Sequence, residues 1–340
     1  MGSGRRINKL MDVDMCSIWG LCTDRTRDRA STKRHRRPGV RVDGLFCLRR
    51  ASCPEGTVRD QGACVESVVV NGVRIAYERT GRGRPVVLAG GTGMPPVAWE
   101  LCGVREDLVR AGFEVITYAA RGVAPSEAPA SPYAMADMAG DLAGLMDALG
   151  LTSATVIGYS LGSFTVELLA HTRPDLVASV VLMAGAGPVT GVLDAMLAAE
   201  AELIATTGRL PAAFTRLQSL LSSLPPAVLC DDEQQTRTWL ELLSAQEDLW
   251  TSADGEVGQA TAAQAWLRDP HRMAALTDIT VPVLVLAFEH DFYFPPRAAK
   301  ISADALPQAE FTVIADAAHG GLLTHPKETS AALLAFLTRT

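Results

Sequence analysis

Short runs of β-branched and other apolar residues alternate with amphipathic runs along much of the chain. The apolar runs have the length and composition of buried strands and cover residues 86–88, 113–118, 155–157 and 177–183. The amphipathic runs have the apolar spacing of helices and cover residues 98–111, 134–149 and 164–171. Because strands alternate with helices, we expect a mostly parallel sheet flanked by helices, which is an α/β fold.

The pattern changes on both sides of this alternation. Before it, VVVNGVRIAYER (68–79) predicts two strands joined by Asn71-Gly72, a strong hairpin signal. After it, helical runs broken by Pro and Gly residues continue without a convincing strand, and the α/β pattern then resumes with strands at 281–288 and 311–314 and helices at 296–305 and 326–337. The expected organisation is a core of residues 67–187 and 270–340, with a helical cap or lid inserted at 188–269.

Residues 1–66 differ from this core in charge and in cysteine content. They hold five of the seven cysteines and a net charge of about +6, whereas the remainder carries about −13. These cysteines lack the close pairs of a zinc site, so we expect a basic, poorly ordered leader and no metal. An acidic core argues against nucleic acid as a partner, and a nucleic-acid-binding arm at 1–66 is the weaker alternative.

The bulk composition narrows the class of protein further. With 340 residues, 48% of them hydrophobic, the chain is long and apolar enough to bury a full core. No uninterrupted apolar run is long enough to span a bilayer, and charged residues interrupt the N-terminal region where a signal peptide would be apolar. These features predict a cytoplasmic protein with no membrane partner. A homodimer stays open.

One short stretch carries a chemical signal. VIGYSLG (156–162) places Ser160 between Gly158 and Gly162, where a predicted strand meets a predicted helix. A sharp strand-to-helix turn brings the two flanking positions close together, so only small residues fit there. The turn lifts the serine hydroxyl clear of the sheet and puts the Leu161 N–H at a helix N-terminus, where it can bind a developing oxyanion. This is the G-x-S-x-G nucleophile elbow, and Ser160 is the predicted nucleophile.

A serine hydroxyl needs a base, and two later stretches supply candidates. His319 follows the last predicted strand in AAHG, and Asp291 follows the strand VPVLVLAF in EHD. Ligands gather at the carboxyl ends of parallel strands, so both positions suit a site. His319 is the predicted base and Asp291 the carboxylate that orients it, while Glu289 remains a rival for Asp291.

The order Ser160, Asp291, His319 resembles the α/β-hydrolase superfamily over about residues 68–340. The resemblance rests on the elbow, the EHD-x-x-x-P-P and AAHG stretches, and the insertion between the two halves of the sheet. It implies that the Gly91 N–H is the second oxyanion donor, with the neighbouring Thr92 as the alternative, in a loop where Ala89 replaces the usual histidine. It also implies that Arg121 fixes a loop through an ion pair.

The insertion and the elbow suggest how a substrate would be held. A lid with an apolar inner face would close over the site and exclude water. The predicted substrate-binding residues are Thr92, Tyr159, Trp239 and Trp250.

These features predict a serine hydrolase that cleaves an ester or related acyl bond of a largely apolar small molecule, without a cofactor or a metal. A C–C bond hydrolase, an acyl-eliminating lyase and a haloperoxidase-like enzyme are alternatives on the same residues. A non-catalytic small-molecule receptor is the alternative from another class.

Overall fold

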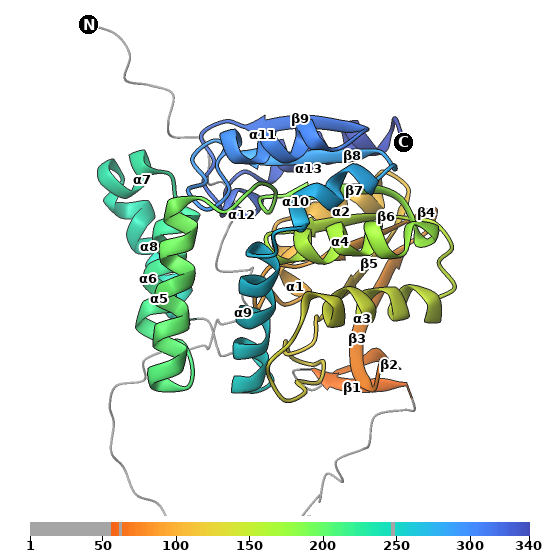
Figure 1. The fold of residues 1–340 in the computed structure, drawn as a ribbon, viewed down its shortest axis with the longest axis horizontal. Helices are drawn as coiled ribbons and strands as arrows, with labels where there is room; N and C mark the ends of the chain where they lie inside the picture. Colours follow the sequence, from red (N-terminus) through yellow and green to blue (C-terminus); the bar gives the residue numbers. More distant parts are fainter. Residues whose placement is uncertain (1–55, 61–62, 246–248) are drawn as a thin grey trace, which may run out of the picture. The chain divides into compact units, whose positions relative to one another are not determined.

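Nine strands form one sheet in the computed structural model, which describes residues 56–60, 63–245 and 249–340 (Figure 1). The strands are β1 (Thr57–Asp60), β2 (Ala63–Val70), β3 (Val73–Gly81), β4 (Arg84–Ala89), β5 (Phe113–Tyr118), β6 (Ala154–Tyr159), β7 (Val177–Met183), β8 (Val283–Phe288) and β9 (Ala309–Ile314). Their order across the sheet is β1-β2-β3-β5-β4-β6-β7-β8-β9. The pairs from β5 to β9 are parallel and the three pairs from β1 to β5 are antiparallel, which confirms the predicted mostly parallel sheet.

Helices connect these strands and form the insertion. Those of the core are α1 (Val97–Leu101), α2 (Val104–Arg110), α3 (Met135–Ala148), α4 (Leu161–Thr172), α10 (Arg272–Ala275), α11 (Pro296–Ala305), α12 (Gly321–Thr324) and α13 (Pro326–Leu337), with 3₁₀ turns η1 (Pro174–Leu176) and η2 (Leu276–Asp278). Those of the insertion are α5 (Gly191–Thr207), α6 (Ala212–Ser223), α7 (Pro226–Asp231), α8 (Glu233–Ala245) and α9 (Ala253–Leu267).

Alternating side chains of the strands fill two hydrophobic cores, one on each face of the sheet. Val87 and Val156 pack with residues of α3, α4 and α11 on one face. Leu88 and Ile157 pack with residues of α1, α2 and α13 on the other. Successive residues of a strand point to opposite faces, so neighbouring residues of β4 and β6 serve different cores.

Two parts of the core differ from the sequence prediction. The strands begin earlier than expected: β1 and the first half of β2 lie within the predicted leader of residues 1–66, whose first 55 residues lie outside the described residues. An added antiparallel strand bonds through its backbone, so it gives little hydrophobic pattern to read. The helix expected at 98–111 is broken into α1 and α2 at Gly103, whose φ of 74° lies in the left-handed region that favours glycine. The predicted hairpin is confirmed, with Asn71 and Gly72 at φ 51° and 77°.

The insertion divides into two parts with different attachments. The last helix, α9, packs against α3, α4 and α5, and its side chains join a third hydrophobic cluster that includes Phe164 and Phe294 of the core. The remaining helices α6, α7 and α8 pack mainly on one another. At the end of α6, a methyl group built on Gly320 would lie 2.8 Å from the Ser223 backbone, so this end of the insertion contacts the residue after His319.

Among the helices of the described part of the chain, none combines the length and the apolarity that crossing a bilayer requires.

Candidate active site

Ser160 occupies the turn between β6 and α4. Its φ of 52° and ψ of −117° are unusual for a residue with a side chain, and such strain is held only where surrounding structure enforces it. Side chains at Gly158 or Gly162 would collide with backbone: the first with Gly162 itself, the second with the carbonyl of Ala89 at the end of β4. The two glycines therefore let the strand turn directly into the helix and leave the Ser160 hydroxyl beyond the carboxyl edge of the sheet.

Three side chains that are distant in sequence meet at this edge. His319 lies in the loop after β9, and its Nε2 is 3.0 Å from Ser160 Oγ. Its Nδ1 is 2.8 Å from Oδ2 of Asp291, which lies in the loop after β8. With the proton on Nδ1, the imidazole donates to the carboxylate and accepts the serine O–H, which leaves the hydroxyl ready to lose its proton.

Asp291 is held as an acceptor on both of its oxygens. Its residue is 1% exposed, and its Oδ1 accepts the N–H groups of Tyr293 at 2.9 Å and Phe294 at 3.0 Å. These bonds fix the carboxylate so that Oδ2 faces His319. The buried carboxylate therefore accepts three hydrogen bonds, and both of its oxygens have a partner.

Glu289, the sequence rival of Asp291, has a different position. Its side chain is exposed, and its Oε2 accepts the backbone N–H of Asp316 at 2.9 Å. Glu289, His290 and Asp316 offer ligand atoms within 4.8 Å of one another, but all three are exposed. Exposed acidic groups commonly lie this close, and we assign no metal to them.

Aromatic rings enclose the imidazole. The Tyr159 hydroxyl donates to the His319 carbonyl at 2.8 Å, and the two rings stack with centroids 5.6 Å apart. Burial raises the pKa of Tyr159, so this phenol keeps the proton that it donates. Tyr293 meets His319 edge-on, with ring centroids 5.1 Å apart. The structure places Tyr159 against the loop that carries His319, and its predicted contact with substrate stays a prediction.

The loop after β4 lies beside the serine. A methyl group on Gly91 would be 3.3 Å from Ser160 Cβ, so the backbone predicted to supply an oxyanion donor is adjacent to Ser160. The Gly91 N–H points to the sulfur of Met94 at 3.4 Å, and the Met94 N–H returns to the Gly91 carbonyl at 3.1 Å. Leu161, the other predicted donor, is the first residue of α4, where helix N–H groups are free to meet an anion. The sequence did not single out Met94.

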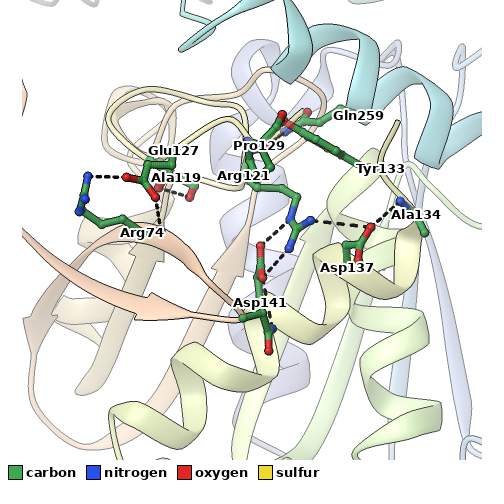
Figure 2. Close-up of polar contacts among 12 residues, drawn as sticks. Arg74, Ala119, Arg121, Glu127, Pro129, Tyr133, Ala134, Asp137, Asp141 and Gln259 are labelled. Carbon is green, nitrogen blue, oxygen red and sulfur yellow. Dashed lines mark hydrogen bonds and ion pairs between the residues drawn. The ribbon is translucent and has the colours of Figure 1, made fainter. Parts of the chain in front are cut away.

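A glutamine of the insertion, also not singled out by the sequence, holds this loop. Gln259 of α9 is 0% exposed, and its Oε1 accepts the Gly93 N–H at 3.0 Å. Its Nε2 donates to the carbonyl of Arg121 at 2.9 Å. Arg121 in turn forms a buried two-point ion pair with Asp141, with distances of 2.6 and 2.8 Å (Figure 2), so the predicted loop-fixing ion pair is present.

The remaining predicted substrate contacts lie on different parts of the fold. Trp250 lies against the loop after β4, because a methyl group on Gly93 would be 2.8 Å from its ring. Thr92 is exposed on the same loop. Trp239 lies on α8, which packs mainly on α6 and α7, and its indole N–H is buried without a hydrogen-bond partner in the described part of the chain.

The insertion also brings polar groups next to Tyr293, whose ring contacts His319. The Tyr293 hydroxyl is buried and forms no hydrogen bond within the described residues, and burial raises its pKa. Gln218 and Ser222 of α6 lie close to the Tyr293 hydroxyl and offset part of this rise in its pKa. Glu200 of α5 accepts a hydrogen bond from Gln218. The part of the insertion beside Tyr293 therefore carries a cluster of polar side chains.

The fold and the elbow together define an α/β-hydrolase. The family model for the alpha/beta hydrolase fold matches residues 85–326, and the chain belongs to this family. It is similar to "Putative non-heme bromoperoxidase BpoC" of Mycobacterium tuberculosis H37Rv, with 32% identity over 266 residues, which are 78% of this chain and 97% of the relative. The crystal structure of that relative superposes with a TM-score of 0.71 and 31% identity, covering 80% of this chain and 97% of the other.

Two further relatives carry names of hydrolases. "Putative carbamate hydrolase RutD" of Caulobacter vibrioides NA1000 is 29% identical over 229 residues, covering 66% of this chain and 80% of the relative. The crystal structure of the enol-lactonase from Burkholderia xenovorans LB400 superposes with a TM-score of 0.65 and 25% identity, covering 80% of this chain and 99% of the other. These similarities support a hydrolase.

Proposed function

We propose that this protein is a serine hydrolase that cleaves an ester or related acyl bond of a largely apolar small molecule. The observation that carries the proposal is the chain of hydrogen bonds from Asp291 through His319 to Ser160, at 2.8 and 3.0 Å. These two hydrogen bonds give Ser160 a base and hold that base, His319, in one tautomer.

The reaction follows from that geometry. Ser160 Oγ attacks the substrate carbonyl carbon as its proton passes to His319 Nε2, and the carbonyl oxygen becomes an oxyanion. The Leu161 and Gly91 N–H groups donate hydrogen bonds to this oxygen. On the Gly91 N–H, the oxyanion replaces the Met94 sulfur as the acceptor. The imidazolium then protonates the leaving group, and an acyl-serine remains. Water, deprotonated by His319, attacks the acyl-serine, and the acid leaves as Ser160 regains its proton.

The surroundings of the serine favour an apolar acyl group. Phe294 lies 6.0 Å from His319 between ring centroids, and Trp250 borders the loop after β4 at Gly93. Aromatic walls of this kind bury apolar substrate surface. The names of the enol-lactonase and carbamate hydrolase relatives describe cleavage at carbonyl groups, which supports the same class of reaction.

The test compares Ser160→Ala with wild type. Ser160→Ala is expected to abolish labelling by a fluorophosphonate probe and to lower the turnover of p-nitrophenyl esters by roughly 10⁴-fold or more. Ser153→Ala changes an exposed serine and is the matched control, with wild-type rates expected. Turnover retained in Ser160→Ala would rule out the proposal. A series of esters of increasing acyl length then defines the substrate class.

A second candidate rests on the bromoperoxidase name of the BpoC relative. If hydrogen peroxide replaces water in the second step, the acyl-serine yields a peroxy acid, and a peroxy acid can oxidise bromide. Peroxide-dependent bromination of a phenol dye in acetate, lost in Ser160→Ala, would identify this activity. Bromination that persists in Ser160→Ala would exclude it.

A further inference from the structure

The loop of residues 90–94, which we call the oxyanion loop, has few contacts of its own that fix its backbone conformation. Its Gly93 has a φ of 64°, in the left-handed region, and one backbone bond closes the turn, from Met94 N–H to the Gly91 carbonyl. Glycines make such a loop adaptable and costly to order. The direction of the Gly91 N–H therefore depends on contacts from outside the loop.

Gln259 supplies one such contact, and its amide is used at both ends. Oε1 accepts the Gly93 N–H and Nε2 donates to the Arg121 carbonyl, at 3.0 and 2.9 Å. The opposite amide orientation would set a donor against the Gly93 N–H and an acceptor against the Arg121 carbonyl. Because the side chain is 0% exposed, water cannot replace either bond, and the orientation is fixed.

The carbonyl that Gln259 binds is itself anchored. Figure 2 shows the Arg121 guanidinium between Asp141 and Asp137, with Gln259 above it. The guanidinium also lies over the ring of Tyr133, 5.4 Å from the centroid. Gln259 thus joins the glycine loop to a buried, charged and well-packed part of the core.

The helix that carries Gln259 is equally fixed. A methyl group on Gly122 would lie 2.6 Å from Gly255 Cα, so α9 and the loop after β5 meet backbone to backbone. The Asp254 carboxylate also accepts a hydrogen bond from the Ser131 hydroxyl at 2.8 Å. The amide of Gln259 therefore has little freedom to move along or around its helix.

We propose that Gln259 is a positioning residue of the active site: it holds the turn that presents the Gly91 N–H to the oxyanion, and it acts through Gly93 without touching substrate. The inference rests on the serine hydrolase function proposed above. It assigns the insertion a part in the chemistry, because α9 belongs to the insertion and Gly91 to the core.

The experiment measures ester hydrolysis and the affinity of a trifluoromethyl ketone, which forms a hemiketal oxyanion on the serine. Gln259→Met keeps the length of the side chain and removes both bonds. Its kcat is expected to fall by about 10- to 100-fold, because a misaligned donor loses part of the 10²–10³-fold effect of one oxyanion bond. The inhibition constant of the ketone is expected to rise in parallel, with KM changed less than about threefold.

Gln264→Met is the matched control. Gln264 lies on the same helix and also donates from Nε2 to a backbone carbonyl, that of Leu197 at 3.1 Å, but not to the oxyanion loop. Its kinetics and its ketone affinity are expected to stay at wild-type values. Gln259→Glu gives a second, more conservative variant. Its protonated carboxyl can donate to the Arg121 carbonyl, so the ratio of variant to wild-type kcat is expected to rise as pH falls.

The outcomes separate the two proposals. If wild type is active and Gln259→Met matches Gln264→Met in kcat and in ketone affinity, the positioning role is overturned. A rise in the KM of Gln259→Met with unchanged kcat would overturn it as well. If Gln259→Met does not fold, a Gln259→Glu ratio independent of pH overturns it instead. Wild type that neither hydrolyses esters nor reacts with fluorophosphonate overturns the hydrolase proposal, and with it this inference.

Discussion

The buried ion pair between Arg272 and Glu167 provides a quantitative test of what holds the insertion to the core. Arg272 of α10 meets Glu167 of α4 through two bonds of 2.8 Å, and its Nη1 donates to the Gly187 carbonyl at 2.8 Å. The two side chains are 1% and 3% exposed. One arginine therefore ties α4, the helix after Ser160, to the chain on both sides of the insertion.

Removing the arginine alone leaves a carboxylate buried without a partner. The expected cost for Arg272→Met is about 3–5 kcal/mol of unfolding free energy, because breaking a buried pair strands one charge. For a large domain, about 2–4 °C in Tm corresponds to 1 kcal/mol, so Tm is expected to fall by roughly 6–20 °C. Replacing both partners, in Arg272→Met with Glu167→Leu, removes the stranded charge and is expected to recover most of that loss.

Thermal and urea unfolding followed by circular dichroism measure these differences. Arg268→Met is the control, since its pair with Asp194 has a similar 2.9 Å distance but side chains that are 44% and 62% exposed. Exposed pairs contribute about 0–1 kcal/mol, so a Tm near wild type is expected. A small loss in Arg272→Met, equal to that in Arg268→Met, would refute the reasoning. So would a double variant as unstable as the single one.

Three further predictions concern the elbow, pH and the histidine loop. Gly162→Ala should lower ester turnover by at least roughly 10²-fold, since its methyl group meets the Ala89 carbonyl, whereas Gly191→Ala, with open space, should not. Burial lowers the pKa of His325, so the unfolded chain binds a proton more readily than the folded chain. The free energy of unfolding is therefore expected to decrease as pH falls below about 6.5. In His325→Gln, the urea midpoint is expected to lack this contribution to the pH dependence. Tyr159→Phe should lower kcat more than it changes KM, since the bond to the His319 carbonyl is lost.

Much of the fold follows from local pattern. The predicted strands at 113–118 and 177–183 and the helices at 296–305 and 326–337 coincide with β5, β7, α11 and α13. The two helices begin at Pro296 and Pro326, because proline at the first helical position has a suitable φ and needs no partner for its missing N–H. Ser160, Asp291 and His319 could also be predicted from the sequence, because each follows a predicted strand and their order along the chain is characteristic.

Other features depend on tertiary contacts that no local pattern records. The break at Gly103 requires a left-handed residue, but a single glycine in an amphipathic run is also tolerated within a helix. Gln259 reads as an ordinary helix residue, and only the fold brings it to the Gly93 N–H. The choice of Asp291 over Glu289 beside His319 likewise needs the direction of the loop after β8.

The contact between Gly122 and Gly255 sets a limit on how this protein can be recombined with its relatives. Helices α6–α8 pack mainly on one another, so a swap of α5–α8 would leave this joint intact and would have to preserve the backbone contact of Ser223 with Gly320. A swap that includes α9 would have to include the loop after β5 from the same donor protein. The backbones of Gly122 and Gly255 are so close that a side chain at either position would not fit. The unit of modular exchange is thus shorter than the unit of insertion.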